Sequence, residues 1–225
     1  MNFNPTPAHN NAMKKEFSKN RCYVNSQGII VSRERPQNEV KANKYNDYWI
    51  KNPRYNKEHP YIQTTIDLCY KWYDTPQNVL EIGAGFGHAA EKFIKEFKLE
   101  SYTGYEFSEC FNELRDRIKS TGFFNYKIYN YDFQQESIFS GYDCVIALEI
   151  LEHINKDLEF LEKLDHGTWV FFSVPSTYSR FHVRFFPFPI SVHFRFQSLL
   201  NIYEIKGIKN NQNIYKWWVV AARKR

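Results

Sequence analysis

The sequence predicts an α/β fold in which a parallel sheet carries helices on both faces. Three observations predict it. Residues 78–82 form an apolar strand that runs into a glycine-rich turn and then an amphipathic helix. Strand-like and helix-periodic segments then alternate from residue 101 to residue 174, which is the pattern of βαβ units. Two more apolar segments close the chain around the polar residues 209–213, and they indicate a hairpin.

The first 44 residues carry weaker patterns than the rest. Residues 1–44 are polar and lack sustained periodicity, so we predict a flexible or lid-like arm with a short strand at 27–32. We place the main domain at residues 45–225. Its first helix should begin at Pro60, because proline is favoured at the first helical position.

The remaining elements follow from periodicity and from breaking residues. Predicted strands cover residues 78–82, 101–106, 126–130, 143–148, 168–174, 202–206 and 216–222. Predicted helices cover residues 88–98, a segment capped by Ser108, a segment directly after residue 148, and a short segment near 197–201.

Composition narrows the class of protein. The 225 residues, 43% of them hydrophobic, suffice for one α/β domain with modest additions. A net charge of +5 is mild and does not itself indicate nucleic acid. The four cysteines include no C-x-x-C pair, so we expect a reducing, cytoplasmic location. No apolar run reaches the roughly 18 residues of a membrane-spanning helix, and we expect no membrane insertion.

The residues of the glycine turn limit the classes of nucleotide ligand that the site could bind. Gly83, Gly85 and Gly87 follow the acidic Glu81. His88 occupies the position where a dinucleotide fingerprint favours glycine or alanine, and no Gly-Lys-Ser/Thr triplet of a P-loop exists. This acidic-x-Gly-x-Gly-x-Gly string resembles motif I of the class I S-adenosylmethionine (SAM) methyltransferases. The resemblance covers about residues 60–223 and implies a Rossmann-like sheet of seven mostly parallel strands, the last one antiparallel, with SAM as cofactor.

Further positions match the cofactor site of that superfamily. Glu106 ends the second strand about twenty residues past the glycine turn, where a ribose-binding acid is expected. The resemblance implies that Asp132 contacts the adenine amino group and that Glu81 contacts the methionine ammonium. Each of these acids also has an alternative interpretation without a ligand, as a solvated residue at a strand end or as a turn residue. The predicted cofactor-binding set is Glu81, Gly83, Gly85, Gly87, Glu106, Phe107, Asp132, Phe133 and Leu148.

An E-x-x-E-H string, Glu149, Glu152 and His153, follows the fourth strand. In a helix these side chains would share one face. The string resembles ubiquinone-type O-methyltransferases and plant small-RNA 2′-O-methyltransferases, where such residues bind a divalent metal. The chemistry needs a base or a Lewis acid because a hydroxyl with pKa near 10 is a poor nucleophile.

We therefore expect Glu149, Glu152 and His153 to be catalytic. They would also hold Mg²⁺, Mn²⁺ or Zn²⁺ together with a fourth ligand, His182 or His193. In the alternative, the string caps a helix and makes supporting hydrogen bonds without metal.

The segment after the fifth strand should overhang the acceptor. Arg180, His182 and Arg184 are the predicted substrate-binding residues, since guanidinium groups bind phosphate or carboxylate. Together with Arg195 they could equally stack on RNA bases or be solvated. The aromatic residues Tyr45, Tyr48, Trp49 and Tyr55 could fold over the cofactor, because aromatic faces attract cations.

The function that the sequence favours is SAM-dependent methylation of oxygen on a small or medium acceptor. Three alternatives remain open at this stage. The first, an RNA-directed enzyme of the same fold, is disfavoured by the scattered lysines and arginines. The second is a small-molecule N-methyltransferase; the Asn/Asp-Pro-Pro motif of DNA adenine enzymes is replaced by residues 147–150. The third is a SAM-binding protein without activity. The oligomeric state is not predicted.

Overall fold

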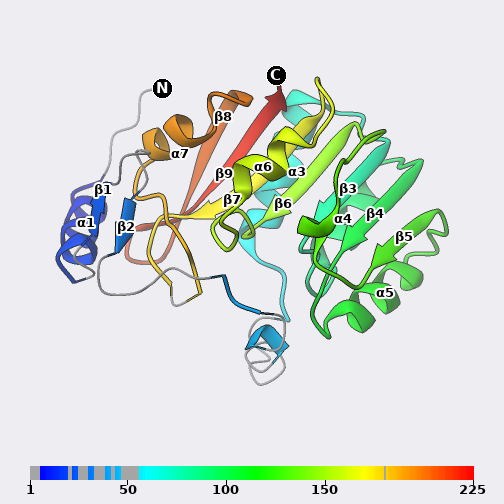
Figure 1. Cartoon of the computed structure of the whole chain (residues 1–225), viewed down its shortest axis with the longest axis horizontal. Coiled ribbons are helices and arrows are strands. Elements are labelled where there is room, and N and C mark those ends of the chain that lie inside the picture. Colours follow the sequence, from blue (N-terminus) through cyan, green and yellow to red (C-terminus); the bar gives the residue numbers. More distant parts are fainter. Residues whose placement is uncertain are drawn as a thin grey trace.

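A seven-stranded sheet forms the centre of the computed structural model, which describes residues 6–19, 22–24, 30–32, 39–41, 44–46, 56–179 and 181–225 (Figure 1). The strand order is β5-β4-β3-β6-β7-β9-β8. The strands are β3 (Asn78–Ile82), β4 (Ser101–Tyr105), β5 (Tyr126–Tyr129), β6 (Cys144–Leu148), β7 (Trp169–Pro175), β8 (Leu200–Lys209) and β9 (Tyr215–Lys224). Strands β3 to β7 are parallel, and β9 runs antiparallel to both β7 and β8. The predicted fold class is confirmed.

Helices cover both faces of this sheet. One face packs on α3 (Pro60–Trp72), α4 (His88–Glu96) and α5 (Phe111–Ser120), and the other packs on α6 (Asp157–Glu162), α7 (Pro189–Phe196) and the 3₁₀ turn η2 (Phe133–Gln135). The alternation of β3 shows why two layers form. Leu80 and Ile82 enter one core, whereas Val79 enters the other, because successive strand side chains point to opposite faces.

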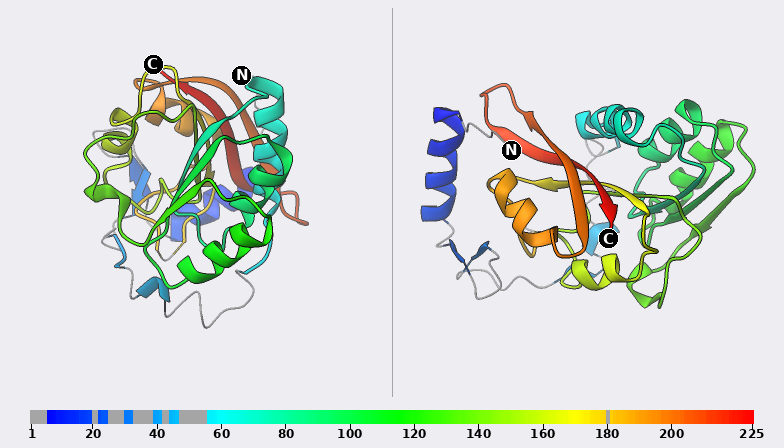
Figure 2. Two further views of the ribbon diagram at one scale, coloured as in Figure 1. Left: turned by 90° about the vertical axis from the view of Figure 1, so that its right-hand side faces the viewer. Right: turned by 90° about the horizontal axis from the view of Figure 1, so that it is seen from above.

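The N-terminal segment contains a helix that the sequence did not predict. Helix α1 (Pro7–Lys19) is followed by a small antiparallel pair, β1 (Cys22–Val24) and β2 (Ile30–Ser32). Figures 1 and 2 place α1 at one end of the molecule, away from α4 and α5. Its described buried residues are His9 and Met13, one turn apart. With so few buried residues, the helix has little apolar periodicity, and for this reason the sequence analysis predicted an arm without a helix.

Three other predictions of local structure were wrong. The helix after β6 begins at Asp157 rather than directly after residue 148, because Glu149 has φ of +56° and the chain leaves the strand through turns. Ser108 is not a helix cap; its hydroxyl accepts a bond from the Cys110 amide at 3.3 Å, ahead of α5. The helix expected near 197–201 instead ends at Phe196, and β8 begins at Leu200.

Among the helices of the described residues, none has the length and apolarity to cross a bilayer.

Candidate active site

A cavity of about 540 Å³ opens at the carboxyl ends of the parallel strands. Its walls come from the loops that follow β3, β4, β5, β6 and β7, and from part of the N-terminal segment. Ligands of open α/β sheets bind at this edge, where the strand order reverses. In this sheet the reversal falls between β3 and β6, so the glycine turn after β3 lies at the expected position.

The three glycines of the turn are required for three different reasons. All have positive φ, at 67° for Gly83, 54° for Gly85 and 80° for Gly87. A Cβ on Gly83 would lie 2.0 Å from Ile150 Cδ1. A Cβ on Gly87 would lie 3.1 Å from the Leu114 Cα, so this glycine lets α5 approach closely. A Cβ on Gly85 would meet nothing within 4 Å, so there the backbone faces open cavity.

Glu106 is fixed beside this turn by backbone amides. Its Oε2 accepts from the Gly85 amide at 2.8 Å and its Oε1 from the Ser108 amide at 2.7 Å. The side chain is buried yet lines the cavity. Each carboxylate oxygen has a second lone pair. The group is therefore able to accept further hydrogen bonds from a ligand with two adjacent hydroxyls.

The loops after β4 and β5 supply the next part of the wall. Asp132 begins η2 and accepts from the Gln134 amide at 3.0 Å. Phe133 is buried, with its ring 5.3 Å from that of Phe160 in an edge contact. Both residues line the cavity, as do Phe107 and Leu148. This part of the wall offers an acceptor beside flat apolar surface, which suits a planar heterocycle.

Glu81 lies deeper at the same edge. It is 3% exposed, and the Tyr102 hydroxyl donates to its Oε2 at 2.6 Å. Burial raises the pKa of Glu81 to about 8, with a smaller contribution from the charge of Glu106, while the Tyr102 bond acts in the opposite direction. A cation placed beside this carboxyl would favour its ionised form.

The side chains of the E-x-x-E-H string lie at two separate positions beside the cavity. The prediction that its side chains share a helical face was wrong, because residues 149–156 form turns. Glu149 accepts from the Ser173 hydroxyl at 2.9 Å and from Trp217 Nε1 at 3.0 Å. Burial raises the pKa of Glu149 to about 8. Glu149 thus lies against β7 and β9, apart from the histidines.

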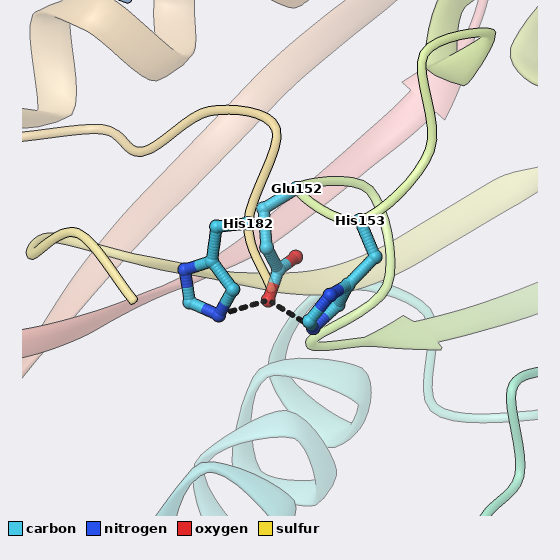
Figure 3. Close-up of side chains that lie close together, drawn as sticks. All are labelled: Glu152, His153 and His182. Atoms are coloured by element: carbon cyan, nitrogen blue, oxygen red, sulfur yellow. Dashed lines mark ion pairs between the residues drawn. The ribbon is translucent and has the colours of Figure 1, made fainter. Parts of the chain in front are cut away.

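At the second position Glu152 and His153 form a cluster with His182 (Figure 3). Glu152 Oε1 lies 3.6 Å from His153 Nε2 and 4.0 Å from His182 Nε2. One potential ligand atom from each residue lies within 4.8 Å of the others. The carboxyl of Glu152 is fully buried, and neither oxygen has a hydrogen-bond partner within the described part of the chain.

The electrostatics of this cluster follow from burial. Burial raises the pKa of Glu152 well above its ordinary value, and the charge of Glu149 adds to the effect. Burial lowers the pKa of His153 to about 4 and that of His182 well below its ordinary value. Burial therefore favours the neutral form of each of the three groups. Glu149 and His193, the other predicted ligands, are not part of this group of residues.

Arg184 and Arg195 do not have the free guanidinium groups that were expected. Arg184 donates to the carbonyl oxygens of Leu151 and Ile154, each at 2.6 Å. Both arginines pair with the fully buried Asp157, at 3.1 and 2.6 Å. Neither lines the cavity, so we assign them a structural role. This differs from the predicted substrate contact for Arg184.

Some predicted residues lie outside the described part of the chain, namely Arg180, Tyr48, Trp49 and Tyr55. Other cavity residues were missed by the sequence analysis. Trp217, His59 and Tyr61 line the cavity, with the Trp217 ring 5.6 Å from Tyr61 in an edge contact. Trp217 comes from the last strand, and no local motif marks it.

Comparisons with known proteins agree with this geometry. Residues 80–166 match the family model Methyltransf_12, described as a methyltransferase domain. A search of curated proteins found no match.

Similar solved structures share the fold at low identity. The N-methyltransferase NodS from Bradyrhizobium japonicum WM9, in complex with S-adenosyl-L-homocysteine (SAH), is 15% identical with a TM-score of 0.66, over 82% of this chain and 99% of that one. Magnesium protoporphyrin IX methyltransferase from Synechocystis PCC 6803, with bound SAH, is 12% identical with a TM-score of 0.63, over 82% and 97%. The Burkholderia thailandensis 1,6-didemethyltoxoflavin-N1-methyltransferase is 13% identical with a TM-score of 0.62, over 90% and 97%.

Residues 80–166 therefore match a methyltransferase domain, and the solved structures share the fold that surrounds this segment.

Proposed function

We propose that the protein transfers the methyl group of SAM to an oxygen of a small or medium hydroxyl-bearing acceptor. One observation carries the choice of oxygen. The buried Glu152 carboxyl, without a hydrogen-bond partner among the described residues, lies between two imidazoles at the carboxyl end of β6. Methylation of an alcohol or phenol requires removal of a proton, and these groups suit that task.

The cofactor would lie along the turn and the loops described above. Glu106 would accept from the two ribose hydroxyls, which gives strong charge-assisted bonds. Asp132 and Phe133 would bind the adenine, and Glu81 would bind the methionine ammonium. Support comes from Gly85, where the backbone faces open cavity beside the Glu106 carboxylate.

The reaction is an in-line displacement. The acceptor oxygen attacks the methyl carbon, and the carbon–sulfur bond breaks with its electron pair going to sulfur, which leaves SAH. The acceptor proton would pass to His153 Nε2. That nitrogen carries the lone pair because Nδ1 lies 2.9 Å from the Phe181 carbonyl, which can only accept a hydrogen bond. Positioning of both substrates in a cleft with little water would supply most of the rate.

A divalent cation fits the Glu152–His153–His182 cluster. The observation that supports this is the buried Glu152 carboxyl beside two imidazoles, because a bound cation would compensate the cost of burying the ionised carboxylate. When bound, such an ion would lower the pKa of an acceptor hydroxyl, and this would replace direct proton transfer to His153, which would then be a ligand. Two nitrogen ligands and one oxygen ligand suit Mn²⁺ or Zn²⁺ better than Mg²⁺.

The cofactor site is tested by titrating SAH into the wild type and Glu106→Gln. We expect about 10- to 100-fold weaker binding in the variant, since charged hydrogen bonds are lost. Glu113→Gln, at an exposed position of α5 that does not line the cavity, is the control and should bind normally. Equal affinity in all three proteins would contradict the assignment.

The cluster is tested by Mn²⁺ and Zn²⁺ titration, without any acceptor. Glu152→Gln and His182→Ala should lose binding, whereas Glu149→Gln should retain it, because Glu149 is held by Ser173 and Trp217 outside the cluster. Unchanged metal binding in Glu152→Gln would refute the ligand set. Labelled-methyl transfer into panels of alcohols, phenols and amines, with and without chelator, then identifies the acceptor class.

A small-molecule amine is the second candidate acceptor. Glu149 gives it support, since a half-buried carboxyl held by Trp217 beside Tyr61 offers a protonated amine both a counter-charge and aromatic surface. The amine panel decides between the two acceptors. For RNA we see no comparable support, since among the described lining residues the lysines are Lys41 and Lys57 and no arginine is present.

A further inference from the structure

We infer that Tyr45 is a positioning residue for His153, and that it links a cover over the cavity to the orientation of that imidazole. We call this cover the covering segment; it comprises residues 39–41 and 44–46. The inference rests on the proposed function, in which His153 Nε2 receives the acceptor proton.

The covering segment is tied to several loops at the carboxyl edge of the sheet. Glu39 accepts from the Asn155 amide and from the Gln134 side chain, the latter at 3.2 Å. Asn46 exchanges two hydrogen bonds with Glu109, one from the Glu109 amide at 2.9 Å and one to its carboxylate at 3.2 Å. The segment therefore joins the loops after β4, β5 and β6, all of which border the cavity.

Tyr45 adds a contact to the reacting groups. Its hydroxyl lies 2.7 Å from His153 Nδ1. Its ring lies 5.5 Å from Phe107 and 5.9 Å from Phe181, so it spans from the cofactor wall to the loop after β7. Tyr45 itself lines the cavity. A side chain in this position contacts both the proposed cofactor-binding wall and the proposed base.

Hydrogen-bond chemistry defines what the contact does. The Phe181 carbonyl can only accept, so His153 Nδ1 carries the hydrogen. The Tyr45 oxygen then shares that hydrogen as a second acceptor. Two acceptors on one side of the ring favour the tautomer whose lone pair is on Nε2, and Nε2 is the atom that faces Glu152. Lifting the covering segment would remove one of these acceptors and an aromatic neighbour of the ring.

The consequence is that the covering segment reinforces, through Tyr45, the orientation that the Phe181 carbonyl already gives to the base. Such coupling excludes water at the moment of transfer. Tyr45 does this through His153 rather than through contact with the reacting atoms.

The test uses the full chain labelled with ¹⁵N-histidine and long-range proton–nitrogen spectra of the imidazoles. His153→Asn identifies the His153 signals. In the wild type, with and without SAH, we expect a single tautomer with hydrogen on Nδ1. In Tyr45→Phe we expect a measurable population with hydrogen on Nε2. Tyr131→Phe is the matched control, because Tyr131 also lines the cavity but its hydroxyl binds Glu136; its His153 signals should equal those of the wild type.

A second readout follows the cover itself. Tryptic cleavage after Lys41 and Lys44, measured by mass spectrometry, should slow when SAH is added to the wild type, and should slow less in Tyr45→Phe. Identical His153 nitrogen shifts in the wild type and Tyr45→Phe would overturn the inference. This holds even if the cleavage rate changed, because Tyr45 would then only pack against its neighbours without orienting the imidazole. Failure of the wild type to bind SAH would refute the proposed function instead, and the spectra of the ligand-free proteins would still decide the role of Tyr45.

Discussion

At the scale of single residues, the unusual feature is the number of buried carboxyl groups at one edge of the sheet. Glu81 and Glu152 are buried and Glu149 is half-buried, and desolvation raises the pKa of each. A buried carboxylate is costly unless a cation compensates it. Burial therefore favours the protonated form of these carboxyl groups, and a cationic ligand beside them would favour the ionised form.

Glu81 should release a proton when SAM binds at pH 7. Its pKa is about 8 in the folded protein, and an ammonium beside it would favour the ionised form. Calorimetry in two buffers of different ionisation enthalpy should detect the release in the wild type and a smaller release in Glu81→Gln. Glu136→Gln serves as the control. A binding enthalpy that does not depend on the buffer would count against the proposed contact.

The same residue predicts how stability changes with pH. The folded pKa of about 8 exceeds the ordinary value of 4.5, so the folded protein binds more protons between these values. The contribution of Glu81 to stability is therefore fully present below pH 4.5 and is lost as the pH rises through 8. Urea unfolding at pH 6 and pH 9 should show a smaller loss for Glu81→Gln than for the wild type. Equal losses would show that Glu81 is not buried as described.

At the scale of elements, the strand–turn–helix unit shows what can be predicted from sequence and why. Residues 78–82 were predicted as a strand and form β3, because their alternation and the glycine stop are local signals. The arginine assignments failed for the opposite reason. Arg184 and Arg195 are 27 and 38 residues from Asp157, their partner, and sequence spacing does not reveal such a contact. For the same reason His182 could only be placed beside Glu152 by analogy.

Substitutions in the glycine turn should have separate effects on protein stability and on SAH binding. Gly85→Ala should fold with a cost of about 1 kcal/mol for positive φ, because its Cβ meets nothing within 4 Å; it should bind SAH weakly, because the methyl enters the ligand space. Gly83→Ala should lose more stability, since its Cβ would overlap Ile150. Thermal unfolding and calorimetry measure the two effects. Normal SAH affinity in Gly85→Ala would place the ligand elsewhere.

The buried pair of arginines gives a stability prediction for α6. Asp157→Ala leaves two largely buried guanidinium groups without their carboxylate, which should cost about 3–5 kcal/mol of unfolding free energy. Glu159→Ala, on the same helix but with a 56% exposed side chain, should change stability by less than about 0.5 kcal/mol. Urea denaturation compares them. Similar losses in the two variants would refute a structural role for this cluster.

At the scale of the whole molecule, the sheet and its two layers are built from the second part of the chain. Within the described part of the chain, every residue of both hydrophobic cores lies between Tyr61 and Ala222. The described N-terminal residues contribute instead to the outside of this body. His9 binds the Pro187 carbonyl at 2.8 Å, and the covering segment borders the cavity. The predicted boundary near residue 45 falls within that covering segment, and it stays a prediction.

A fragment of residues 56–225 should fold and retain the seven-stranded sheet, because both cores are complete within it. It should bind SAH more weakly than the full chain, since Glu39, Tyr45 and Asn46 are absent. Circular dichroism and thermal unfolding test the first expectation, and calorimetry tests the second. An unfolded fragment would mean that α1 and its neighbours contribute more to stability than their burial indicates.

The left-handed backbone of Glu149 has one more consequence. A non-glycine residue in this region costs about 1–3 kcal/mol, and the residue here is a glutamate rather than the glycine or asparagine that tolerates the geometry. The chain accepts that conformational penalty at the point where it must turn sharply out of the sheet. In return, the next four residues reverse direction and bring the adjacent Glu152 and His153 opposite His182, so a local loss of stability is exchanged for the convergence of two neighbouring groups with a third from a distant part of the polymer.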